Sequence, residues 1–212
     1  QFQFGYDFAK GRLKYYMGIQ SMSNFMVEYR RSKRGVREQI LNLNNEEKLQ
    51  IIYLLDENYK PENRKYKYEF FYDNCSSRIR DILKKVFKEN LNFYKSPNSN
   101  KFTFRETIHQ YLKYFPWLEL GIDLVLGQKI DVLVNNENLM FLPLNVEQIF
   151  DQSFVLNKKA EKNLIKSKNT LIEPYKNKNK FTSIGLYSWI LLAITLILIV
   201  FNPSTATSPS VP

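Results

Sequence analysis

Cysteine and histidine are almost absent from this sequence, which holds one of each among its 212 residues. A single cysteine excludes an internal disulfide framework. One cysteine and one histidine are also too few for a zinc site built from these ligands, so we expect neither a metal nor a cofactor. Aromatic residues, by contrast, make up 15% of the chain. That content is enough to build a core and is not typical of a disordered protein.

Acidic residues are outnumbered by basic ones, 21 to 31, which gives a formal net charge of +10. Such a balance suits nucleic acid or an anionic membrane. Much of the excess lies within residues 157–180, which hold eight lysines (158, 159, 162, 166, 168, 176, 178 and 180). No zinc-finger or RNA-recognition signature accompanies it. We therefore expect a membrane as a partner and no nucleic acid.

Long hydrophobic runs are lacking except at residues 181–201, which carry no charge. About 21 helical residues span about 30 Å, the thickness of the hydrocarbon core of a bilayer. We interpret the run as one transmembrane helix, with a buried core helix as the alternative. The lysines precede the run, so the positive-inside rule would place residues 1–180 in the cytoplasm. The Pro/Ser/Thr-rich residues 202–212 are expected to be a disordered tail.

The remaining pattern predicts an α+β domain at residues 1–156, followed by a basic juxtamembrane connector at 157–180. Phe25–Arg31 and Val36–Leu43 read as the two strands of a hairpin. Asn44 and Thr103 resemble helix N-caps, and another helix is expected to begin at Pro116. The chain opens at Gln1 with no signal peptide, and we expect a mature form or a fragment.

The only cysteine lies at a predicted boundary between a strand and a helix. The aromatic run Tyr66–Tyr72 predicts the strand, Asp73 and Asn74 are suited to an N-cap, and apolar residues at helical spacing follow. Cys75 would then lie in the first helical turn, where orphan N–H groups and the helix dipole favour an anion. A thiolate there is a better nucleophile than an ordinary thiol. The alternative is a small buried residue that closes the corner.

Several segments together resemble one known family in order and spacing. They are Arg12–Tyr16, Leu41–Lys48, Asn58–Arg64, Phe71–Leu83, Thr103–Arg105 and Trp117–Gly127. The chain is similar to the N-terminal periplasmic domain of the Lnb type over about residues 1–175. The most specific part is the Asp-Asn-Cys-x-x-Arg-x-Arg-Asp core that begins at Asp73.

The resemblance implies a circularly permuted papain-like fold, incomplete at the N-terminus, and a thiol enzyme that moves an acyl chain within a bacterial lipoprotein. Cys75 would attack an ester carbonyl, hold the acyl group as a thioester and pass it to an amine or to water. Asp73 and Asn74 would orient the turn or polarise a substrate carbonyl, although capping alone explains them. Arg78 would pair with an anionic group or anchor an acid. The family's histidine belongs to a Phe-Gly-His-type motif upstream of Phe2–Tyr6.

Because this chain begins after that motif, His109 is the one histidine that could serve as the base, provided that its helix packs beside Cys75. We expect the chain to be weakly active or inactive as it stands. The first hypothesis is therefore a thiol acyltransferase or hydrolase anchored in the inner membrane, facing the periplasm and acting on a lipid or lipoprotein acyl ester. The second is a truncated envelope protein with only a structural or binding role. The oligomeric state is left open.

Overall fold

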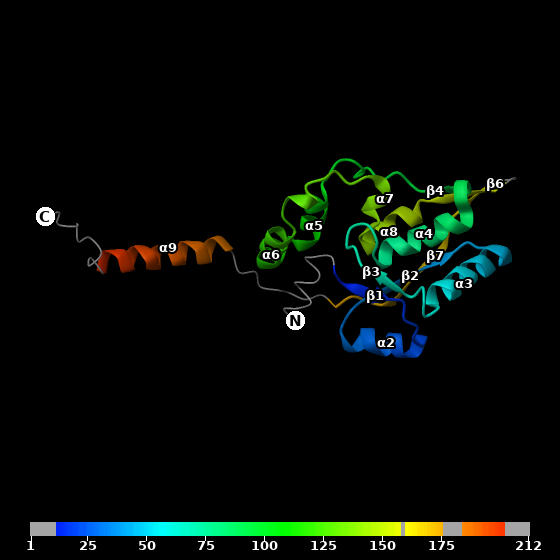
Figure 1. Ribbon diagram of the computed structural model, residues 1–212, viewed down its shortest axis with the longest axis horizontal. Helices are drawn as coiled ribbons and strands as arrows, with labels where there is room; N and C mark the ends of the chain where they lie inside the picture. Colours follow the sequence, from blue (N-terminus) through cyan, green and yellow to red (C-terminus); the bar gives the residue numbers. More distant parts are fainter. Residues whose placement is uncertain (1–11, 158–159, 176–183, 202–212) are drawn as a thin grey trace.

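The computed structural model describes residues 12–157, 160–175 and 184–201 (Figure 1). Its helices are α2 (Met22–Arg31), α3 (Asn45–Tyr59), α4 (Cys75–Phe87), α5 (Phe104–Leu112), α6 (Pro116–Leu126), α7 (Asn136–Leu139), α8 (Pro143–Asp151) and α9 (Ile184–Phe201). Its strands are β1 (Lys14–Tyr16), β2 (Val36–Leu41), β3 (Lys65–Lys67), β4 (Leu91–Asn92), β5 (Phe154–Asn157), β6 (Ala160–Asn163) and β7 (Ile165–Ile172). The mixed content confirms the α+β prediction.

One hydrophobic core joins α4, α5 and α8. Its buried members are Leu83, Phe87, Phe104, Ile108, Ile130, Val134, Leu139, Met140, Phe141, Val146, Ile149, Phe150, Val155 and Leu164. Phe141 lies at the centre of an aromatic group, with ring centroids 5.6 Å from Phe70 and 5.3 Å from Phe104. The segment that precedes α4 therefore packs directly on the core, which holds the start of this helix in place.

The strands within the described residues form three small antiparallel sheets instead of one large sheet. β1 pairs with β3, β2 pairs with β7, and β4, β5 and β6 form a three-stranded sheet in that order. Three of these pairings, all but β5–β6, join segments far apart in the sequence. The β1–β3 pair matters most for the site, because it lies immediately before α4.

The predicted hairpin is wrong in its first strand. Residues 22–31 form helix α2, which begins at an N-cap where the Ser21 hydroxyl accepts a hydrogen bond from the backbone N–H of Asn24. β2 is a strand as predicted, but its partner is β7. The alternating apolar residues of 25–31 fit a helix as well as a strand over so short a run, and local capping decides for the helix.

The predicted connector at 157–180 is folded over much of its length. β6 and β7 lie within it, and its lysines make ion pairs with the rest of the domain. The ammonium group of Lys162 lies 2.7 Å from a carboxylate oxygen of Glu47, and that of Lys168 lies 2.6 Å from Asp151. Some of the lysines that give the chain its positive net charge thus form ion pairs within the domain. Residues 158–159 and 176–180 of the segment lie outside the described residues.

The prediction of a transmembrane helix at 181–201 is also corrected. Within residues 12–157, 160–175 and 184–201, no helix is long and apolar enough to cross a membrane. The helix α9 covers Ile184–Phe201 of the predicted run, and residues 181–183 lie outside the described residues. It extends away from the domain in Figure 1. The predicted tail at 202–212 lies outside the described residues.

Helix α9 meets the domain at α6, where the rings of Trp117 and Tyr187 lie 5.9 Å apart, edge to face. Helix α6 begins at Pro116 and ends just before Gly127, as predicted. It has no buried residue, although its sequence is largely apolar. The face that it exposes includes Leu118 and Leu124.

Candidate functional site

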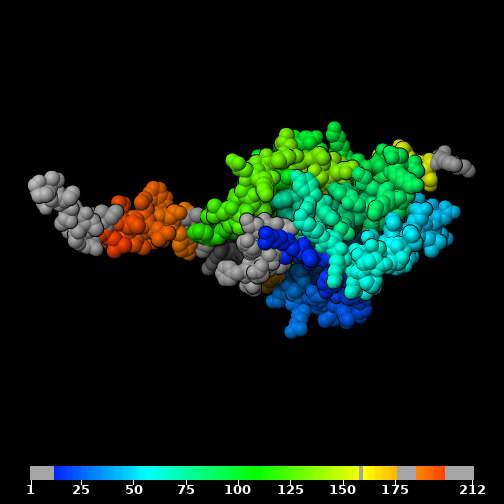
Figure 2. Space-filling model, in the orientation of Figure 1, coloured from blue at the N-terminus to red at the C-terminus, as the bar shows by residue number. Residues whose placement is uncertain are grey.

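A pocket of about 690 Å³ opens beside the N-terminus of α4, and Cys75 lines it. Its walls come from β1 and the loop after it, from the segment that joins α3 to β3, and from one face of α4. In Figure 2 the blue atoms of the N-terminal described residues lie on the surface beside the teal atoms of the segment that carries β3 and α4. The volume is in the range of small-molecule sites.

The turn before Cys75 is closed by backbone hydrogen bonds in both directions between Glu69 and Asp73, at 3.0 and 2.9 Å. β3 (Lys65–Lys67) includes only the first two residues of the predicted strand Tyr66–Tyr72, because this turn follows at once. Asn74 is the N-cap of α4, as predicted, and is 2% exposed. Cys75 is the first helical residue, and its side chain is exposed.

The side chain of Asn74 is fully engaged in the cap. Its Oδ1 accepts hydrogen bonds from the backbone N–H groups of Ser76 (2.8 Å) and Ser77 (2.9 Å). Its Nδ2 donates to the carbonyl oxygens of Phe70 (2.6 Å) and Phe141 (2.8 Å). Such a buried amide leaves no group free to polarise a substrate carbonyl. Asn74 therefore positions Cys75 and ties its turn to the core.

Asp73 and Arg78 form a bidentate ion pair at the pocket wall. Nε and Nη2 of Arg78 donate to the two carboxylate oxygens of Asp73 at 2.7 and 2.9 Å. The guanidinium carbon also lies 3.5 Å from the ring centre of Tyr66. Both charged groups predicted for the site are thus brought next to Cys75, where they neutralise each other and stiffen the turn.

Two tyrosines near the thiol have raised pKa values. Burial raises the pKa of Tyr68 to about 12, and the nearby charge of Cys75 adds to it. Burial likewise raises the pKa of Tyr66, an effect that Arg78 opposes and Cys75 reinforces. Both phenols therefore keep their protons at neutral pH and are hydrogen-bond donors.

His109 lies elsewhere and is not among the residues that line this pocket. Its Nε2 is 3.0 and 3.1 Å from the carboxylate oxygens of Asp123, and its Nδ1 is 3.5 Å from Glu119. Arg105 joins the same cluster through Asp123, Asp131 and the carbonyl oxygen of Gly127. The structure therefore does not bring the predicted base to Cys75. His109 ties α5 to α6 instead.

Two aspartates of this cluster, Asp123 and Asp131, have lowered pKa values. Burial alone would raise the pKa of Asp123, but hydrogen bonds from His109 and Arg105 outweigh burial. The hydrogen bond from Arg105 lowers the pKa of Asp131. An acid whose pKa is lowered by folding contributes stability above its unfolded pKa of about 4, and that stability is lost as the pH falls through the folded value.

We expect Arg105→Met to lower the free energy of unfolding by about 2 kcal/mol at pH 7, because Asp131 loses its partner and the partly buried Asp123 keeps only His109. The deficit should shrink below about pH 4, where the wild-type carboxylates are protonated as well. Urea unfolding at pH 7 and pH 3 measures both values. The matched control is Arg31→Met at the end of α2, which should change little at either pH. A deficit that is equal at the two pH values would contradict the assignment.

The pocket includes residues that sequence reasoning did not assign to the site. Five of them are Tyr15, Tyr16, Asn63, Arg64 and Lys85. Of these five residues, all but Lys85 belong to the segments Arg12–Tyr16 and Asn58–Arg64, which carry part of the family resemblance. That resemblance is the feature of the sequence that indicates them. Lys85 follows Arg78 by seven residues and shares its helical face.

Metal binding was not expected, and among the described residues no group of three or more histidine, cysteine, aspartate or glutamate side chains is arranged to hold a metal ion.

Comparison with family models finds a match to the Lnb N-terminal periplasmic domain over residues 1–112. The match includes Cys75 and every residue of the pocket wall, and it is shorter than the resemblance over about residues 1–175 that the motifs indicated. It indicates a periplasm-facing protein of the bacterial envelope. Comparison with curated proteins and with solved structures gives no match.

Proposed function

Because the chain belongs to the family of Lnb N-terminal periplasmic domains, we propose that it is a thiol acyltransferase or acyl hydrolase of the bacterial envelope, with Cys75 as the nucleophile. The observation that supports this proposal is the position of an exposed thiol at the first residue of α4, inside a pocket of about 690 Å³. A permuted papain-like fold is part of the same proposal.

The proposed reaction has two steps. The Cys75 thiolate attacks the ester carbonyl, the S–C bond forms, and the C–O bond breaks to release an alkoxide that takes up a proton as an alcohol. Water or an amine then attacks the thioester, which returns the thiol and yields a free acid or an amide. Cys75 lies at the N-terminal end of α4, where the helix dipole is suited to a nucleophile that carries negative charge.

The other residues of the site have supporting roles in this proposal. Asn74 holds the first turn of α4 through its cap. The Asp73–Arg78 pair keeps the preceding turn rigid. Tyr66 is protonated and lines the pocket, so its phenol is suited to donate a hydrogen bond to the oxyanion that forms on the carbonyl oxygen.

A second candidate is a non-catalytic envelope protein that only binds an acyl ligand in this pocket. The observation that favours it is the engagement of His109 with Asp123 and Glu119, together with the lack of a histidine among the described residues of the pocket. Both candidates bind in the same place, so the formation of a covalent intermediate separates them.

The test is to incubate the full chain with p-nitrophenyl butyrate and to weigh the intact protein by mass spectrometry. We expect one butyryl group, released by neutral hydroxylamine as a thioester would be. Cys75→Ala should acquire no such group and should lose nitrophenol release by about 10³-fold or more. Ser76→Ala is the matched control on the same turn. The absence of an adduct, or an adduct that Cys75→Ala retains, would overturn the enzymatic proposal.

A further inference from the structure

The charges of the Cys75 pocket do not cancel within the described residues. The pocket is lined by five charged side chains, Arg64, Asp73, Arg78, Asp81 and Lys85. Asp73 is neutralised by Arg78. Asp81 pairs with a buried residue behind the wall, since Nε of Arg80 lies 2.8 Å from its carboxylate. The two acids are therefore both matched, and two cations are left over.

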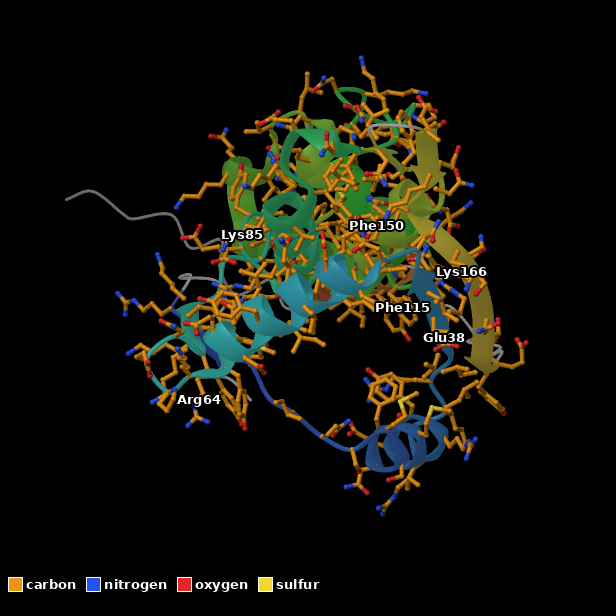
Figure 3. All side chains as sticks on the ribbon, turned by 90° about the vertical axis from the view of Figure 1, so that its right-hand side faces the viewer. Glu38, Arg64, Lys85, Phe115, Phe150 and Lys166 are labelled. Carbon is orange, nitrogen blue, oxygen red and sulfur yellow. The ribbon has the colours of Figure 1, made fainter. Side chains whose placement is uncertain are left out.

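The two remaining cations, Arg64 and Lys85, make no ion pair with any of the described residues. Nε of Arg64 is buried and has no hydrogen-bond partner in that part of the chain. A buried guanidinium N–H without an acceptor is rare and costs free energy, so Arg64 keeps a donor that the described residues do not use, on a residue that lines the pocket. Lys85 is exposed on the pocket face of α4. Figure 3 labels both residues, and they lie on the same side of the molecule.

Most of the rest of the wall is apolar or aromatic, apart from Asn58 and Asn63. Met17, Ile79 and Ile82 line it together with the tyrosines of β1 and β3. A pocket with an apolar wall, a thiol and two unmatched cations is complementary to a molecule that has an acyl chain, an ester and an anionic group.

We propose that Arg64 and Lys85 form an anion subsite of the Cys75 pocket, which selects acyl esters that carry a phosphate or carboxylate group near the ester. The role of these esters as substrates rests on the proposed function, whereas the subsite itself requires only binding. Arg64 and Lys85 hold the anionic group and leave the ester carbonyl facing the sulfur. They are specificity-determining residues, and the nucleophile remains Cys75.

The subsite can be measured without catalysis, from the alkylation of Cys75 by two reagents of similar size. Iodoacetate carries a carboxylate and iodoacetamide is neutral. The rate constant for iodoacetate divided by that for iodoacetamide does not depend on the nucleophilicity of the sulfur. This ratio is divided by the same ratio for glutathione, which corrects for the intrinsic reactivities of the two reagents and gives a normalised ratio. We expect a normalised ratio of about 5 or more for the full chain at low salt. It should fall toward 1 in 1 M salt, where the Debye length is only about 3 Å.

Three variants locate the effect. Arg64→Gln and Lys85→Gln should each lower the normalised ratio by at least about twofold, and the double variant should bring it close to 1. Lys65→Gln is the matched control, because it removes an exposed positive charge next to Arg64 in sequence that does not line the pocket. Lys85 is exposed, so its variant should fold even where that of Arg64 does not. A wild-type ratio near 1, or an equal fall in Lys65→Gln, would overturn the proposal.

The source of the anion is tested by protection of Cys75 against iodoacetamide. The probes are inorganic phosphate, acetate, dihexanoyl phosphatidate and neutral dihexanoylglycerol. Protection by phosphatidate at concentrations well below those of phosphate supports an anionic lipid, and equal protection by phosphate supports a small free anion. Failure of all three anions, or equal protection by dihexanoylglycerol, would reject the subsite. A raised alkylation ratio without any butyryl adduct would leave the subsite standing and reject only the enzymatic function.

Discussion

Replacement of Asn74 by alanine is expected to lower the free energy of unfolding by about 3 kcal/mol. The change removes a helix cap, which is worth about 1 kcal/mol. It also leaves the carbonyl oxygens of Phe70, which is part-buried, and Phe141, which is buried, without the donor that they share. Buried polar groups that lose a partner cost about 1–3 kcal/mol each, and partial relaxation reduces the sum.

Asn74→Asp separates the two contributions. Aspartate keeps an oxygen for the N–H groups of Ser76 and Ser77 but cannot donate to the two carbonyl groups. We expect it to be nearly as destabilising as alanine, because it places a carboxylate against two carbonyl oxygens. Chemical denaturation of the three proteins measures the differences. Full recovery of stability in the aspartate variant would show that capping alone matters at this position.

Asn74→Ala should also lower the reactivity of Cys75. Asn74 fixes the first turn of α4, and the sulfur is carried by the next residue. A frayed first turn would no longer hold the sulfur at its position beside the end of the helix dipole. Alkylation of Cys75 by iodoacetamide at pH 7 should therefore slow by severalfold in Asn74→Ala, measured where the variant is still folded.

Phe141→Ala is expected to have the largest effect on stability, a loss of about 4 kcal/mol. The side chain is 1% exposed and contacts the rings of Phe70, Phe71 and Phe104. Truncation of a buried phenylalanine removes its transfer free energy and leaves a cavity that the neighbours fill only in part. Three aromatic side chains would lose contacts at once.

Two controls define this result. Phe141→Leu keeps most of the volume and should cost about 1–2 kcal/mol. Tyr53→Ala removes an aromatic ring that is 63% exposed on α3 and should cost at most about 0.5 kcal/mol. Thermal and denaturant unfolding measure all three. Equal losses for Phe141→Ala and Tyr53→Ala would contradict the assignment of Phe141 to the core.

Core and site are coupled in this protein, since the carbonyl group of Phe141 accepts a hydrogen bond from the cap of α4. A change in the aromatic group would therefore move the turn that carries Asp73 and Cys75. We expect Phe141→Leu to change the alkylation rate of Cys75 even though the two side chains do not belong to the same pocket wall.

The elements that the sequence determined are those held by neighbours in the chain. The caps Asn44, Asn74 and Thr103 each bind a residue within one turn, and each helix begins where they predict. The location of Cys75 at a helix start follows from the same local chemistry. Membership of the family is also determined by the sequence alone, because the motifs of the family are defined by residue order.

Tertiary structure decided what depends on segments that are distant in the chain. β2 pairs with β7 across more than a hundred residues, and no local pattern in Val36–Leu41 identifies that partner. His109 has acidic neighbours because α6 folds back on α5, which removes it from the thiol. Arg64 and Lys85 face one pocket only because β3 places the end of α3 beside α4. Charge balance within a site depends on such long-range pairing, so a sequence shows which charges exist and the fold decides which of them are left for a ligand.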